Sequence, residues 1–374
     1  MRSHRRFRER MESKRRIDRI DLARGLSISM IVLAHVLRSG KVADYLSSTG
    51  VAAFFFLGGI VFTRREHWGR WLLLRVRKLY LPYLAVALIS IVFYTLIGSQ
   101  AKSGIESAAG VAVAGDPNGI LNNLAGMLYA NSKNGSMKWN ETLWFIPCYL
   151  LTTLLAVLVE EMVARTKEGT RIAVMIACFP LMYVITNISH LHLPFQAETA
   201  LHMLPFFEAG ILFRSTYLKD QKRAKAGTGF RFALFFVLSV LAAYLDGPIS
   251  IRTDKYPHFP LSFLSLALGV LQVLLLSVLL ETKDRKRWER ALCTLGQESM
   301  GVMLWNKFPV VFFQLVLPKV LPVFKDVFSG DNTLSDLVLA APVALVCVLL
   351  CLVLTFLLHC LKGRAGKILF REKC

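Results

Sequence analysis

Arg24 and His35 lie inside the first long apolar segment of the chain, residues 20–37. His35 follows Arg24 by eleven residues, which is close to three turns of an α-helix, so both side chains are expected on one face, roughly 16 Å apart. Ionisable side chains inside a membrane are costly and usually face the bundle interior, where they serve function. Histidine is suited to proton transfer near neutral pH. The segment therefore indicates an enzyme or a transporter.

Asp21 precedes Arg24 by three residues and can pair with it on the same helix face. Such a pair would lower the cost of holding the guanidinium near the cytoplasmic interface. The structural alternative is a histidine bonded to a neighbouring helix and an arginine that extends to the lipid headgroups. The shared helix face favours the functional interpretation.

The composition predicts an all-α polytopic integral membrane protein. Of the 374 residues, 55% are hydrophobic, and the mean hydropathy is +0.50. Repeated apolar runs near 20 residues have the size of bilayer-spanning helices. We expect about ten transmembrane helices, at 20–37, 47–63, 79–98, 141–160, 172–189, 199–213, 232–246, 260–280, 299–317 and 337–361.

The basic residues give these helices an orientation. With the N-terminus in the cytoplasm, 34 of the 45 Lys and Arg residues fall on the cytoplasmic side and 9 on the other. This is the positive-inside pattern, and it places both termini in the cytoplasm of a multi-pass protein of the cell (plasma or inner) membrane. The same distribution argues against nucleic acid as the partner of a chain with net charge +20.

The predicted organisation is a basic cytoplasmic segment at 1–19, a transmembrane domain at 20–361 and a basic tail at 362–374. Residues 99–140 are expected to form a long outer loop. The seven cysteines lie mostly in apolar runs without a matching histidine cluster. We therefore expect neither a metal site nor a disulfide framework.

Six short motifs follow one another along the chain. They are IDLARG at 20–25 with His35, AFFFLGG at 53–59, RKLYLPY at 77–83, LWFIP at 143–147, LPFFEAG at 204–210 and LGQESM at 295–300. In this order they resemble the motifs of the membrane-bound acyltransferase 3 family, and LWFIP is similar to its fucose 4-O-acetylase-like branch. One position departs from the pattern. The family usually has a histidine seven residues after the serine of the last motif, whereas this chain has Asn306 seven residues after Ser299.

The resemblance implies transfer of an acyl group, usually acetyl from acetyl-CoA, to a hydroxyl of a cell-surface glycan or its lipid-linked precursor. His35 would then act as the base or accept the acyl group as a relay. Asn306 could keep a hydrogen bond but could not exchange a proton. Lys307, which follows it, is a candidate substitute cation.

Other residues could complete the site. Arg75, Arg77 and Lys78 stand at the cytoplasmic mouth and suit the phosphates of an acyl-CoA, although basic residues there also set topology or contact membrane lipids. Glu208, in the sixth predicted span, could orient His35 or be a hydrogen-bonded core acid.

Trp144 and Glu141 are candidate acceptor-binding residues at the outer membrane face. Trp144 could instead be an interface anchor, as could Trp305. His190, His192, His202 and His258 show no ligand spacing and are expected to be surface or core residues.

The sequence therefore predicts a membrane O-acyltransferase. The rival interpretation is a proton-coupled transporter or a glycan-export protein that uses Arg24, His35, Glu208 and Lys307. No internal repeat of the kind that many carriers show is evident.

Overall fold

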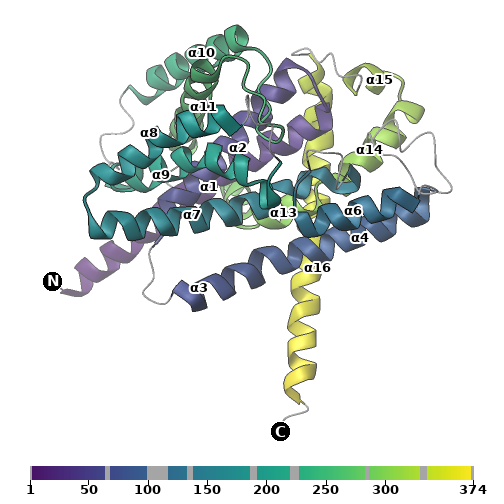
Figure 1. Ribbon diagram of the computed structural model, residues 1–374, viewed down its shortest axis with the longest axis horizontal. Coiled ribbons are helices and arrows are strands. Elements are labelled where there is room, and N and C mark those ends of the chain that lie inside the picture. Colours follow the sequence, from purple (N-terminus) through teal and green to yellow (C-terminus); the bar gives the residue numbers. More distant parts are fainter. Residues whose placement is uncertain are drawn as a thin grey trace.

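The computed structural model is an all-α membrane protein (Figure 1). It describes the main chain of residues 2–63, 68–98, 117–132, 138–185, 192–219, 227–282, 286–328 and 335–371, and side chains from Asp18 to Leu358 with a few further gaps. Within these ranges the extended structure is limited to one isolated bridge, between Ser250 and Lys255.

The first half of the chain forms α1 (Arg2–Leu37), α2 (Lys41–Val61), α3 (Trp68–Arg75), the π-helical turn η1 (Val76–Tyr80), α4 (Leu81–Gly98), α6 (Pro117–Tyr129), the 3₁₀ segment η2 (Lys138–Trp144), α7 (Phe145–Arg165) and α8 (Gly169–Val184). The second half forms η4 (Pro194–Gln196), α9 (Ala197–Lys219), α10 (Thr228–Asp246), α11 (Phe259–Leu280), α12 (Arg287–Gln297), α13 (Ser299–Trp305), α14 (Lys307–Val320), α15 (Phe324–Val327) and α16 (Asp336–Arg371).

Each of the ten predicted spans overlaps helical structure in the described residues, and 299–317 overlaps two helices, α13 and α14. Among the described residues, seven helical stretches are long and apolar enough to cross a bilayer: Asp18–Leu37, Lys41–Val61, Gly69–Leu96, Asn140–Arg165, Thr228–Asp246, Phe259–Leu280 and Asp336–Leu358. The bent pair α13–α14 would be an eighth. Of the remaining predicted spans, α8 is shorter, with 16 residues, and α9 carries Glu208 and Arg214.

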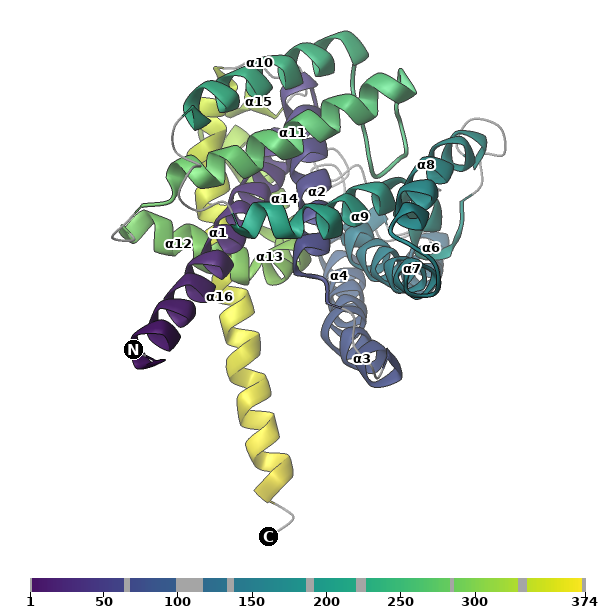
Figure 2. The same cartoon turned by 90° about the vertical axis from the view of Figure 1, so that its left-hand side faces the viewer.

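Helices α1 and α2 lie at the centre of the bundle and pack against α9, α11, α12 and α16 (Figure 2). Two close approaches depend on glycine. A methyl group at Gly296 of α12 would overlap the main-chain oxygen of Asp21 on α1. A methyl group at Gly59 of α2 would overlap that of Phe207 on α9. These glycines allow close main-chain contact between α12 and α1 and between α2 and α9. The contacts fix the relative positions of the helices that carry the candidate site residues.

Prolines explain two departures from regular α-helix near the candidate residues. Pro309 has no N–H for the carbonyl of Trp305, and its ring would crowd that carbonyl, so the helix breaks there. The result is a 50° bend between α13 and α14 at Asn306. Likewise, the π-helical turn that carries Arg77 and Lys78 ends just before Pro82, in keeping with a proline that removes a helix donor.

The expected long loop at 99–140 is in part wrong, because residues 117–129 form α6, which packs on α4. Its apolar residues recur at helical spacing, which the surrounding Gly- and Asn-rich composition masks. The N-terminal end of α1, α3 and the C-terminal part of α16 lie at the lower and left edges of the molecule, whereas α6 and α15 lie at the right (Figure 1).

Candidate active site

Three charged side chains cluster near His35 at the end of α1. The Oε2 atom of Glu141 lies 3.2 Å from Nη1 of Arg252, and its Oε1 atom lies 3.7 Å from Nζ of Lys307. His35 is within electrostatic range of all three residues. The four come from α1, η2, the loop between α10 and α11, and the break before α14. All are partly exposed, so a ligand can reach them.

His35 occupies the last turn of α1, and α14 fixes that turn. The side-chain amide of Gln314 donates hydrogen bonds to the main-chain oxygens of His35, at 2.9 Å, and Val36, at 3.3 Å. These carbonyls have no partner within α1 because the helix ends. Gln314 therefore ties the imidazole-bearing turn to the same helix that carries Lys307.

Glu141 is held by the polar residues around it. Asn140 adopts a non-helical conformation (φ −148°, ψ 66°) that starts the 3₁₀ turn. Its amide donates to Oγ of Ser90 on α4 at 2.9 Å, and its carbonyl oxygen accepts from Thr142 at 2.7 Å. Trp144, on the same segment, is only 6% exposed and packs edge-on against Phe145. The indole of Trp144 is thus part of the core beside the site.

Asn306 and Trp305 contribute unpaired polar atoms next to Lys307. Asn306 is 1% exposed, and neither its amide nitrogen nor its carbonyl oxygen has a hydrogen-bond partner among the described residues. The indole nitrogen of Trp305 is likewise buried and unpaired. Such groups are costly in a resting protein. They are available to a bound ligand that supplies the missing hydrogen bonds.

Arg24 and Asp21 lie at the other end of the α1 span. Gln297, which ends α12, donates a hydrogen bond of 2.8 Å to the Asp21 carboxylate, and Asp21 interacts electrostatically with Arg24. Their interaction is electrostatic, without a direct ion pair between these two described residues. Nε of Arg24 is buried and finds no hydrogen-bond partner within the described part of the chain, which leaves donor capacity at this end for a ligand.

The basic residues before α4 lie apart from these groups. Arg77 and Lys78 are exposed on η1 and make no hydrogen bond or ion pair with a described residue. The Arg75 guanidinium lies 5.3 Å from the ring centre of Trp71. No contact joins the three to Arg24 or His35 in the described structure. Their exposure leaves the cations accessible to an anion, and it equally suits contact with lipid headgroups.

Glu208 belongs to a different cluster. Its Oε2 atom accepts a short hydrogen bond from Nη1 of Arg171, and the same guanidinium binds Glu160 at 2.7 Å and Glu168 at 3.0 Å. These contacts join α7, α8 and α9. Glu208 is fully buried and faces Arg171, so its expected orientation of His35 is not seen. The cluster has the geometry of a structural clamp.

The other candidate histidines that the structure describes lie outside the charged cluster near His35. His202 is buried, with Nδ1 3.3 Å from Oδ1 of Asp254 and its ring centre 4.8 Å from that of Tyr256, the two rings tilted by 35°. His258 is 68% exposed, with Nδ1 3.5 Å from Asp246. His192 is exposed, and His190 lies outside the described residues.

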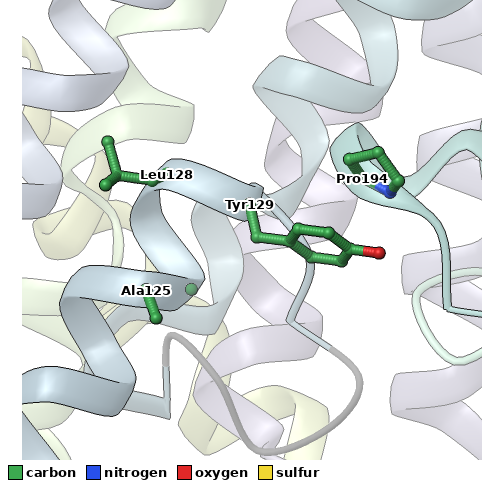
Figure 3. A pocket seen from close by; sticks show the side chains of 5 residues that line it. Ala125, Leu128, Tyr129 and Pro194 are labelled. Carbon is green, nitrogen blue, oxygen red and sulfur yellow. The ribbon is translucent and has the colours of Figure 1, made fainter.

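An open depression of about 500 Å³ lies between α6 and η4 (Figure 3). It is lined by Ala125, Gly126, Leu128, Tyr129 and Pro194, and it is almost wholly apolar. The Tyr129 hydroxyl donates to the main-chain oxygen of His192 at 2.7 Å. None of the candidate catalytic residues lines this depression, so it is a surface feature apart from the reaction site.

Arg252 was missed by reasoning from the sequence, which counted it only as an outer loop cation. The signal available was weak. It consisted of a short polar turn, Ser250 to Lys255, between two apolar helices. Only the packing of that turn against α9 and η2 shows that its arginine reaches Glu141.

The comparisons with known proteins identify the family of the chain. A family model described as an acyltransferase domain (acyltransferase 3) matches residues 17–359, which is most of the chain and includes all the clusters described above. No curated protein and no solved structure matches the chain. The chain, with its charged cluster held at the end of a buried first helix, therefore belongs to the acyltransferase 3 family of membrane proteins.

Proposed function

We propose that this membrane acyltransferase moves an acetyl group from acetyl-CoA to a hydroxyl of a cell-surface glycan or its lipid-linked precursor, in the cell membrane. The observation that carries the proposal is the cluster of His35 with Glu141, Lys307 and Arg252. A base beside fixed positive charges is what acyl transfer to a hydroxyl requires.

The step follows from these groups. The unprotonated imidazole of His35 takes the proton of the acceptor hydroxyl, and the oxygen attacks the thioester carbonyl. The C=O bond opens to an oxyanion, which Lys307 and Arg252 stabilise. The oxyanion then re-forms the carbonyl and expels the CoA thiolate, which receives the proton from the imidazolium. Glu141 offsets the positive charge around His35 during the transfer. Preorganised donors of this kind contribute about 10²–10³ in rate.

The donor would enter from the cytoplasmic side. Arg24, with its unpaired Nε, and the exposed Arg77 and Lys78 are suited to the phosphates of acetyl-CoA, with Arg75 behind them. The pantetheine arm would then extend along α1 toward His35. The two ends of this path are separated by roughly 16 Å of helix, which an extended pantetheine can span.

The test is acetylation of surface glycan in cells that carry the wild type, a deletion or His35→Ala at matched membrane abundance. Base-labile bound acetate should fall to the deletion level in His35→Ala, while uptake of small solutes is unchanged. His192→Ala is the matched control, because that side chain is exposed and away from the cluster. Normal acetylation with altered flux would instead select the transporter.

The structure separates the groups that a proton relay would need. Glu208 is bound to Arg171 in the α7–α8–α9 clamp, whereas Lys307 lies 3.7 Å from Glu141, with His35 in electrostatic range of both. The relay of Arg24, His35, Glu208 and Lys307 is therefore interrupted, and the observation favours the enzyme.

A further inference from the structure

Arg252 is carried to the reaction site by the short loop between α10 and α11. The loop is closed by reciprocal main-chain hydrogen bonds between Ser250 and Lys255, at 3.0 and 2.9 Å. Arg252 lies within this turn, and its guanidinium extends to Glu141. On the predicted topology this loop is on the outer side, where the acceptor would arrive.

Residues of α9 and η4 hold the loop in place through polar contacts. Oδ1 of Asp254 accepts a hydrogen bond of 2.8 Å from Thr199 and lies 3.3 Å from Nδ1 of His202. The amide of Gln196 donates to the main-chain oxygen of Arg252 at 3.3 Å. Gln196 and Asp254 both have φ of 52°, a left-handed conformation that costs free energy in residues with a side chain. Tertiary contacts therefore hold Arg252 where it is.

Among the described residues around the Arg252 guanidinium, positive charges outnumber negative charges. Glu141 is a single carboxylate shared between Lys307 and Arg252. The electrostatic neighbours of Lys307 include Arg38 as well. Unbalanced charge is expensive at membrane depth, and an incoming anion would offset it. Nη1 of the guanidinium lies 3.2 Å from Glu141, and no N–H group of the Arg252 side chain donates a hydrogen bond to a described residue, which leaves these donors for a bidentate partner.

We propose that Arg252 and Lys307 bind an anionic group of the acceptor, so that the preferred acceptor is a sugar that bears a carboxylate or a phosphate. The inference rests on the proposed transfer to a glycan hydroxyl and adds the chemical class of that glycan. The unpaired amide of Asn306 and indole nitrogen of Trp305 would meet its neutral hydroxyl groups.

The test uses the purified full-length protein in phosphatidylcholine nanodiscs with acetyl-CoA. The acceptors are p-nitrophenyl β-glucoside, its glucuronide and its 6-phosphate, which differ only at carbon 6. Acetyl transfer and binding are measured for each. Hydrogen bonds to charged groups predict kcat/KM about 10- to 100-fold higher for a charged acceptor. Arg252→Gln should abolish this preference, so that the charged acceptors and the neutral glucoside are transferred with similar kcat/KM, while Arg252→Lys should restore part of the preference.

Lys255→Gln is the matched control. Lys255 lies on the same loop and is exposed, but it acts on Asp44 rather than on Glu141. The preference should survive in this variant. A preference for the phosphate alone would support the site and assign it to phosphorylated sugars.

Two results separate this inference from the proposed function. Equal transfer to the neutral and the charged sugars would overturn the anion site and leave the transferase intact. Selective binding of the charged sugars that is lost in Arg252→Gln, without transfer to any acceptor, would support the anion site and overturn the proposed transfer. Absence of both preference and selective binding overturns the anion site.

Discussion

The side-chain amide of Gln297 is 2.8 Å from the carboxylate of Asp21, and this hydrogen bond joins the end of α12 to the first turn of the buried part of α1. Asp21 in turn faces Arg24. Gln297→Leu removes the amide that holds the Asp21 carboxylate, and the carboxylate can then no longer orient the Arg24 guanidinium. We expect the KM for acetyl-CoA to rise about tenfold, as for loss of a hydrogen bond to a charged group, with a smaller change in kcat.

The kinetic measurement is a titration of acetyl-CoA at saturating acceptor. Gln297→Glu is the informative companion, because it places a second carboxylate against Asp21. It should raise the KM further than Gln297→Leu does. An unchanged KM in both variants would remove Arg24 from donor binding.

Asn306→Leu should separate stability from activity. The substitution is nearly isosteric and replaces a buried amide that has no hydrogen-bond partner. The variant is expected to be more stable by about 1–3 kcal/mol, yet to transfer acetyl more slowly because the ligand loses a hydrogen-bonding group. Thermal unfolding and initial rates are measured on the same preparation. A variant that is both less stable and equally active would show that the amide is satisfied in the resting protein.

Gly296→Ala tests the contact of α12 with α1. A methyl group there would overlap the main-chain oxygen of Asp21, and overpacking of this kind costs about 1–3 kcal/mol. The melting temperature of the detergent-solubilised protein should fall. Gly69→Ala is the control: nothing lies within 4 Å of the added methyl group, and alanine in a helix is favoured over glycine by about 0.5–1 kcal/mol. Equal melting of the two variants would contradict the close approach.

The Arg171 clamp should affect folding more than chemistry. Arg171→Met leaves the fully buried Glu208 without its cation, which is expected to cost about 3–5 kcal/mol. The double variant Arg171→Met with Glu208→Leu removes both charges and should recover part of that loss. Activity per folded molecule should stay near wild type in the double variant. A selective loss of activity there would return Glu208 to the catalytic site.

Arg77→Ala and Lys78→Ala test the basic turn before α4. Both side chains are exposed, so their attraction for the phosphates of the donor should be screened by salt. We expect a higher KM for acetyl-CoA in each variant at low ionic strength and a smaller difference at high ionic strength. Lys286→Ala, which removes another exposed cation, should behave as wild type. Unchanged donor affinity in both variants would leave this turn with a role in topology alone.

The predicted spans were visible because each is an apolar run near the length that crosses a bilayer, whereas the shorter or more polar helices α3, α6 and α12 were not predicted. The break at Asn306 was implicit in Pro309, but whether a proline kinks or interrupts a helix depends on the surrounding packing. The electrostatic interaction of Asp21 with Arg24 was predictable from local spacing. The proximity of His35 to Glu141 and Arg252 was not, because it depends on tertiary contacts between segments far apart in the chain. Glu208 shows the same limit: its burial was predictable, and its partner Arg171 was not.

The segment from α12 to α14 runs alongside α1 and touches it at both ends, through Gly296 and Gln297 at Asp21 and through Gln314 at His35. These two contacts fix the position of the bent segment α12–α14 along α1. A shift of one helical turn at the Asp21 end, about 5.4 Å, would break the contact of Gln297 and move Lys307 relative to His35. The packing of this segment against α1 therefore positions the proposed donor site and the proposed acceptor site relative to each other.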